Sequence, residues 1–293
     1  MKTNAIIRIV ILSIVLVVLL GILLAGLGFK SFIARKNSEI RWETSHSPAG
    51  SSENTFSDSF TASTGLRDIE IQWVAGTITV QAGDVDQVTY QETEVSDSKY
   101  KMIARESSDD LKIIYCDENI GFSFSMFGAN IDVIKDLTIT VPRDMILESL
   151  EIDAASAEVI IRDLTIHEVS LDTASGKCQL DGCSIGELDI DTASGDVSFN
   201  GSLDMLDFDA ASAEFEGILT NTPRSIKVDS LSGDIDITLP SDAGFTVSTD
   251  AMSSDFSSDF ETTIRNGEYI CGDGSCKIEY SGMSGDITIR KKR

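Results

Sequence analysis

A corner sequence of the type Asp-x-x-Ser-Gly-Asp recurs along the second half of the chain, and it constrains the fold more than any other feature. Successive copies are separated by 19, 19, 18 and 20 residues. They begin at Asp153, Asp172, Asp191, Asp209 and Asp229, and degenerate copies follow from Asp250 and Ser281. A unit this short buries its apolar side only by stacking on its neighbours.

Short strands with alternating apolar and polar residues flank each corner, as in 188–191 and 197–200. Alternation places one side of a strand in a core and the other in water. We therefore predict an all-β fold, a parallel β-solenoid of about 19-residue coils. The register points these residues inward: Leu171, Leu188, Ile190, Val197, Phe199, Phe208, Phe215, Ile226, Val228, Ile235 and Ile237. It points these outward: Asp189, Asp191, Asp207, Asp209 and Asp236.

Composition divides the chain into four segments. Residues 1–29 are predicted to form a transmembrane anchor with one helix, and 30–65 a flexible linker. Residues 66–145 are predicted to form an N-terminal β coil with an antiparallel flap or cap. Residues 146–290 are predicted to form the solenoid repeats, with a hairpin insertion near 257–280. Solenoid ends expose unpaired backbone groups and need such caps.

The anchor prediction depends on residues 9–27, a stretch of nineteen residues without a charge. As one helix it spans roughly 30 Å, the thickness of the hydrocarbon core. A cleaved signal peptide is the alternative, although its apolar stretch is usually shorter. The Ser- and Thr-rich sequence of 45–64 cannot bury enough surface to offset its ordering entropy, which indicates a stalk.

Flanking charges leave the membrane orientation open. Lys and Arg are slightly more numerous after the apolar stretch than before it, which by itself favours a cytoplasmic C-terminal side. A long folded domain, however, is translocated largely regardless of these charges. We expect a single-pass protein of the cell membrane, with its C-terminal domain extracytoplasmic.

The chain carries a formal net charge of −25. So acidic a surface repels phosphate backbones, because nucleic-acid binding needs Lys and Arg to displace counterions. The two histidines, His46 and His167, leave little room for histidine-based catalysis. We therefore expect no nucleic-acid partner and no enzymatic activity. We also expect no catalytic, cofactor-binding or metal-binding residues and no cofactor.

Stacking of the coils predicts two rows of carboxylates. One contains Asp153, Asp172, Asp191, Asp209 and Asp229, and the other contains Glu158, Asp196, Glu214 and Asp234. Like charges on neighbouring strands destabilise a sheet, so the rows need an explanation. Carboxylate oxygens suit Ca²⁺. Alternatively, each Asp caps its own turn through bonds to the backbone. The glycine-rich nonapeptide of calcium β-rolls is absent, which favours capping.

Five cysteines leave at least one thiol unpaired. Cys271 and Cys276 flank the sequence Gly-Asp-Gly-Ser, and a disulfide across this hairpin is one possibility, two free thiols the other. Cys178 occupies the inward position that Val159 and Val197 occupy in neighbouring coils. It is therefore predicted to be a small core residue.

The anchor, the linker, the strand Leu137-Thr-Ile-Thr-Val-Pro142 and the tandem Asp-Thr-Ala-Ser-Gly-Asp-Val units together resemble the bacterial putative-adhesin family of β-strand-repeat domains. The similarity covers roughly residues 66–290, and the Ser-Gly-Asp corner is its most specific element. The resemblance implies a β-solenoid, often membrane-anchored and surface-exposed, in bacteria of Gram-positive type. It brings no catalytic motif. This chain departs from the pattern at the Ser-Ala corners, Ser156-Ala157 and Ser212-Ala213, and at the insertion before Ser284.

The expected function is a non-enzymatic, membrane-tethered surface β-solenoid, a binding or adhesion-type module of the cell envelope. Its partner would be a cell-wall component or an envelope protein. A regulatory or sensing membrane protein of an envelope-stress system is an alternative that the sequence does not separate from adhesion. A carbohydrate-active β-helix enzyme is disfavoured, because the coils are compact and the acidic surface would repel uronates.

Overall fold

The computed structural model describes residues 43–44, 60–62, 65–93, 95, 97–116, 134–253 and 255–292. This part of the chain is all-β apart from one 3-10 turn, η1 (Ser98–Tyr100). None of its helices is long and apolar enough to cross a membrane. The predicted anchor, residues 1–29, and most of the predicted linker lie outside the described residues.

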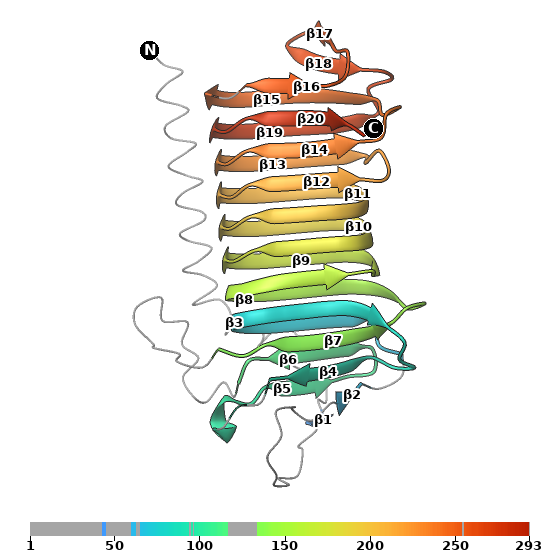
Figure 1. Ribbon diagram of the computed structural model, residues 1–293, viewed down its shortest axis with the longest axis vertical. Coiled ribbons are helices and arrows are strands. Elements are labelled where there is room, and N and C mark those ends of the chain that lie inside the picture. The colour runs from blue at the N-terminus through green and yellow to red at the C-terminus, as the bar shows by residue number, and fades with distance from the viewer. Residues whose placement is uncertain are drawn as a thin grey trace.

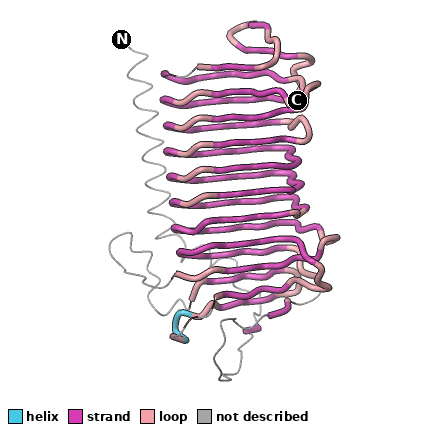
Figure 2. Tube along the Cα trace, in the orientation of Figure 1, coloured by secondary structure: helices cyan, strands magenta, loops and turns pink. Residues whose placement is uncertain are grey.

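Parallel strands stack in coils along the long axis of the molecule, as Figures 1 and 2 show. Asp172 pairs with Asp191 and Cys178 pairs with Val197, one coil further on. The predicted parallel β-solenoid is thus confirmed. The central strands are β8 (Ile146–Arg162), β9 (Thr165–Ser175), β10 (Cys178–Ser194), β11 (Val197–Ser212), β12 (Phe215–Leu219), β13 (Ser225–Ser232) and β14 (Ile235–Leu239).

Each coil has two strand segments, which form two lateral sheets. The long strand β10 supplies the second segment of one coil and, after a bend near Gly182, the first segment of the next. The core fills the narrow space between these sheets. The inward residues predicted above are all buried, with exposed fractions of 3% or less. Cys178 is buried among them at 1%, as predicted for a small core residue.

The Ser-Gly corners require glycine for a steric reason. Gly195 has a φ of +128°, a conformation that L-residues with a side chain rarely adopt. A Cβ atom there would also overlap the carbonyl oxygen of Gly176 in the preceding coil. At the Ser-Ala corners the side chains of Ala157 and Ala213 are buried instead. The two corner types therefore fit the same stack in different ways.

At the C-terminal end, the order of coils in space differs from their order in the chain. The last repeat, β19 (Cys276–Ser284) and β20 (Ile287–Lys291), lies between two coils that precede it in the sequence. On one side it pairs with β13 and β14. On the other it pairs with β15 (Phe245–Ser253) and β16 (Phe256–Ser258). The chain thus skips one level and then returns to fill it.

The N-terminal end shows the same interchange. The first coil strand, β3 (Asp68–Gly83), pairs on one side with β8. On its other side it pairs with β6 (Asp110–Ile114) and β7 (Leu137–Pro142), which come later in the chain. The first and last coils are therefore both interior, where partners on both sides satisfy their backbone groups.

Antiparallel strands cover both ends of the stack. At the N-terminal end, β4 (Thr89–Glu92) pairs with β7, and β5 (Ile103–Glu106) pairs with β6. Two stretches of the predicted linker join this cap, since β1 (Glu43–Thr44) pairs with β5 and β2 (Phe60–Thr61) with β4. At the other end, β18 (Glu268–Cys271) pairs with β15 and with β17 (Thr263–Arg265). Capping removes free strand edges that would otherwise pair with other molecules.

A buried ion pair fastens the N-terminal cap to the coils. Lys135 and Glu92 have side-chain exposed fractions of 1% and 8%. The Lys135 ammonium donates to Glu92 and to the carbonyl oxygens of Tyr100 and Tyr115, and it lies 4.7 Å from the centre of the Trp73 ring. Burial lowers the pKa of Lys135, and Glu92 opposes that shift. Every proton of the ammonium has an acceptor, so this charge is fully satisfied.

Candidate functional site

The outward side of the first strand segments carries the carboxylate row that the sequence predicts. Backbone register aligns Asp153, Asp172, Asp191, Asp209 and Asp229 in one line across β8 to β13. Beyond Asp229 the line continues through Ser281 to Asp250, because the last repeat is interposed. The row of five aspartates is therefore confirmed, and its sixth member is displaced by one level.

A second line runs beside the first, two residues earlier on each strand. It contains Glu70, Glu151, Ser170, Asp189, Asp207, Lys227 and Glu279. Sequence reasoning placed Asp189 and Asp207 outward but did not treat this line as a row. We call the two lines together the acidic face.

The carboxyl groups of the acidic face lie in surroundings that disfavour their ionised form. Burial raises the pKa of Asp153 to about 7, and the carboxylates of Asp172 and Glu151 add to that rise. Burial likewise raises the pKa of Asp191 to about 6, with a further contribution from Asp172. The pKa of Asp209 is also raised to about 6, chiefly by burial and despite Lys227. Partial burial and repulsion between stacked carboxylates therefore both raise these pKa values.

Two lysines neutralise parts of the acidic face. The Lys227 ammonium lies 2.9 Å from Asp207, 3.1 Å from Asp229 and 4.0 Å from Asp209. Lys112 forms an ion pair with Glu70 near the N-terminal end. Along the two lines, the positions between these lysines carry no basic residue. That stretch includes Asp153 and Asp191, whose pKa values are raised.

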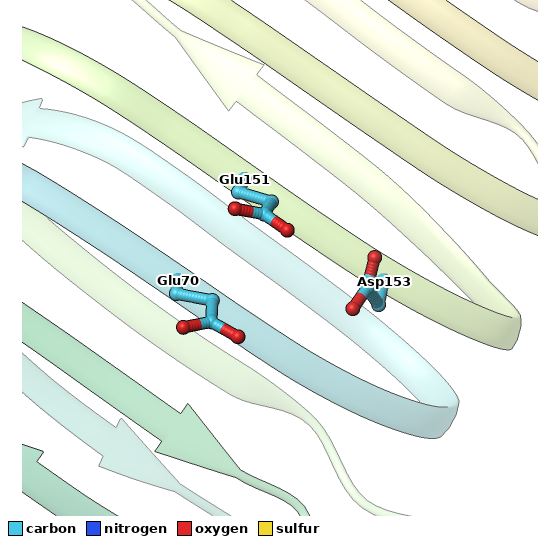
Figure 3. A group of neighbouring side chains, drawn as sticks. All are labelled: Glu70, Glu151 and Asp153. Carbon is cyan, nitrogen blue, oxygen red and sulfur yellow. The ribbon is translucent and has the colours of Figure 1, made fainter. Parts of the chain in front are cut away.

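One group of carboxylates on the described residues is close enough to share a cation. One oxygen from each of Glu70, Glu151 and Asp153 lies within 4.8 Å of the others. Figure 3 shows these three side chains on neighbouring strands. Carboxylate oxygens are ligands that Ca²⁺ accepts. Glu70, however, already accepts a hydrogen bond from Lys112 at 2.5 Å. The Lys112 ammonium therefore already occupies part of the site that a bound cation would need.

Some of the predicted corner acids cap the backbone of the next coil. An Asp234 carboxylate oxygen accepts a hydrogen bond from the Asp286 backbone N–H at 2.9 Å. Asp286 in turn accepts one from the backbone of Asp255. For Asp234 and Asp286, capping therefore operates between coils rather than within one turn. The five aspartates of the first row are not among these capping acids. At the equivalent corner position of two earlier coils, the Lys177 ammonium lies 3.8 Å from the Asp196 carboxylate.

The outward side of the second strand segments differs from the acidic face. We call this side the second face and define it by the outward residues of 178–181, 197–200, β12, β14 and β20. It mixes amides, hydroxyls and charges of both signs. Arg290, for example, forms an ion pair with Asp236, and the Asn200 amide donates to Asp181 at 2.7 Å.

All five cysteines are free thiols. Cys271 and Cys276 do not face each other across a hairpin, because both pair with Phe245 from opposite sides of β15. Two strand spacings separate them, roughly 9.6 Å, which exceeds the reach of a disulfide. The disulfide interpretation is therefore wrong. Burial raises the pKa of Cys178 to about 11 and that of Cys276 to about 12, so these thiols stay protonated.

The fold and its faces define a class of protein: a capped, single-stack parallel β-solenoid with two lateral sheets. The Toastrack DUF4097 family model matches residues 66–206 and, in an overlapping second match, residues 156–290. Overlapping matches are what a repeated coil produces. The chain therefore belongs to the Toastrack DUF4097 family, in agreement with the resemblance drawn from its corners.

Solved structures similar to this chain come from several bacteria. A putative adhesin from Bacteroides fragilis has 14% identity and a TM-score of 0.45, covering 82% of this chain and 98% of its own. A putative cell adhesion protein from Clostridium sporogenes has 12% identity and a TM-score of 0.38, with coverage of 82% and 100%. A putative lipid binding protein from Parabacteroides distasonis has 13% identity and a TM-score of 0.31, with coverage of 82% and 97%. No curated protein matches the chain.

Proposed function

We propose that the protein is a non-enzymatic binding module of the cell envelope, held at the membrane by residues 1–29 and displayed outside the cell. The observation that carries this proposal is the stack itself. Regular coils present two broad lateral faces, and caps close both ends. Elongated repeat folds of this kind generally act through extended surfaces.

The chemistry of the described residues supports a non-enzymatic role. A nucleophilic cysteine must be partly exposed and ionisable, whereas all five thiols here are buried. Two depressions on the second face are half open to solvent rather than enclosed. Binding sites for small substrates are usually concave and bury most of the ligand.

Strong negative charge has a role in this proposal. Rods that carry stacked carboxylates repel each other, which prevents lateral pairing of their sheets. The same charge disfavours nucleic acid as a partner. Regulation through another membrane protein remains the alternative function, and it differs from adhesion in the partner alone.

Membrane topology provides the first test. We would introduce Ser51→Cys in the stalk and Thr3→Cys before the apolar segment, then label intact cells with a membrane-impermeant maleimide. Labelling of Ser51→Cys but not of Thr3→Cys is expected. The unmodified chain is the background control, because its native thiols are buried. The reverse labelling pattern would overturn the proposal.

The nature of the partner provides the second test. After cross-linking in cells, adhesion predicts that the protein stays with the cell-wall fraction, whereas regulation predicts a discrete membrane-protein adduct. Recovery of the protein with neither fraction would contradict both functions.

A further inference from the structure

A groove crosses the second face at the level of residues 197–200. Ser198 lies in register between Gln179 and Glu216, and Asn200 lies between Asp181 and Ile218. Serine is shorter than glutamine and glutamate, so the surface is hollowed at Ser198 between these two longer side chains. Four residues of strand make the groove about 13 Å long.

Two adjoining depressions make up this groove. Their volumes are about 270 Å³ and 220 Å³, and both are lined by Gln179, Ser198 and Glu216. The first extends to Arg162, and the second extends to Lys177 at the corner. Since they share three lining residues, they are one continuous site.

Hydrogen-bonding groups in the groove are available to a ligand. Asn200 uses one amide proton on Asp181, which leaves its second amide proton and its carbonyl oxygen. Within the described part of the chain, Gln179 and Ser198 make no side-chain hydrogen bond. Amides and hydroxyls both donate and accept, so the groove offers both kinds of contact at spacings of about 4.8 Å, the distance between strands.

Charges of both signs border the groove. Two basic residues, Arg162 and Lys177, and four acidic residues, Asp181, Asp196, Glu214 and Glu216, line it. A strongly anionic ligand would be repelled by the acidic majority, and a cationic ligand would be repelled by Arg162 and Lys177 on the side of the earlier coils. A neutral ligand meets neither repulsion.

Backbone pairing in the stack selects between kinds of neutral ligand. The strands that floor the groove already use their backbone groups in the parallel ladder, for example between β11 and β12. An extended peptide lying on the face therefore finds no backbone partner there and cannot bind by adding a strand. Hydroxyl groups of a sugar can instead bond to side-chain amides and carboxylates. Ile218, 38% exposed, offers an apolar contact for the C–H side of a sugar ring.

We propose that this groove binds a short neutral oligosaccharide. The proposal deepens the binding function proposed above and rests on it, since it names the ligand class and the face. Binding is expected to be weak for one molecule, because the site is half open to solvent, and to strengthen when many tethered copies meet one polymer.

The test measures oligosaccharide binding to the full chain in detergent. Tri-N-acetylglucosamine, cellotriose and maltotriose would be titrated at millimolar concentrations and followed by saturation-transfer NMR on the sugar and by calorimetry. At least one is expected to bind. Ser198→Leu fills the groove floor and is expected to weaken that binding at least tenfold. Thr79→Leu is the matched control, because Thr79 occupies the same outward line three levels away and lies outside the groove.

Folding of each variant is checked through its unfolding temperature. If Ser198→Leu fails to fold, Gln179→Ala replaces it, since truncation of an outward side chain leaves the core intact. Absence of binding by all three sugars overturns the groove proposal, and so does undiminished binding by a folded groove variant. Cell-wall retention is measured in parallel on the same variants. Retention without sugar binding would leave the proposed function standing while removing this inference.

Discussion

The two lateral faces share one backbone ladder but differ in how their charges are satisfied. On the acidic face, Asp153, Asp172 and Asp191 stack on each other without a basic neighbour in the same lines, and their pKa values are raised. On the second face, Asp236 is held by Arg290 and Asp181 by the Asn200 amide. One backbone ladder therefore supports two faces with different electrostatics, because outward side chains do not enter the core and can differ from coil to coil.

A change in pH is expected to have the largest effect on stability, and this effect should come from the acidic face. A carboxyl group with a raised pKa binds protons more tightly in the folded than in the unfolded state, so stability falls as pH rises through that window. The window runs from about 4, the ordinary value for aspartate, to about 7 for Asp153 and about 6 for Asp191 and Asp209. We expect the unfolding temperature, measured by circular dichroism, to be several degrees higher at pH 5 than at pH 8.

The variant Asp153→Asn/Asp191→Asn/Asp209→Asn isolates the acidic face in that experiment. It should be more stable than the wild type at pH 8 and should lose most of the pH dependence. A wild-type unfolding temperature that falls steadily on acidification from pH 8 to pH 5 would contradict the account of this face.

Removal of the bridging lysine should have the next largest effect. Lys227→Ala leaves Asp207, Asp209 and Asp229 without their shared ammonium. Because these groups are partly exposed, we expect a loss of about 1–2 kcal/mol in the free energy of unfolding. Urea denaturation at pH 7.5 measures it.

Lys177→Ala is the matched control on the other side of the coil. The Lys177 side chain is 64% exposed and lies 3.8 Å from Asp196, so its loss should cost at most about 0.5 kcal/mol. Equal losses from both lysine variants would mean that the acidic face depends on its lysine no more than an exposed corner does.

Neutralising one aspartate of the acidic face should have a smaller effect, and it should stabilise the protein rather than destabilise it. Asp191→Asn removes a charge that lies between Asp172 and Asp209, and its amide can donate to either neighbour. We expect a gain of about 0.5 kcal/mol at pH 8 and little change at pH 5. On the second face, Glu216→Gln should change stability little at either pH, because Arg290 already holds the neighbouring Asp236. A loss of stability on Asp191→Asn at pH 8 would count against stacked repulsion.

Salt should give the smallest effect. Raising NaCl from about 0.1 M to about 1 M shortens the Debye length from about 10 Å to about 3 Å and screens partly exposed carboxylates. The unfolding temperature of the wild type should increase by more than that of Asp172→Asn/Asp191→Asn. If both proteins respond equally in a thermal melt, the response does not come from the acidic face.

Much of the coil interior could be predicted because its signals are local. Leu188, Ile190 and Phe199 alternate with polar residues, and each was correctly placed in the core. The aspartate row followed from the repeat spacing for the same reason. The groove could not be predicted, because its depth depends on the relative heights of Gln179, Ser198 and Glu216 on three different coils. The alignment of those positions was implicit in the sequence, but the shape of the surface they form was not.

The sequence by itself determined that successive copies of one corner stack into a parallel solenoid, and which side of each strand is dry. It did so because backbone pairing and apolar burial repeat identically at each step. Only the tertiary structure decided which coil is last. Neighbouring coils are nearly equivalent partners, so the order at each end depends on long connections and on the caps that satisfy the final strand. That is why β19 and β20 lie inside the stack, and why Cys271 and Cys276 lie on opposite sides of β15.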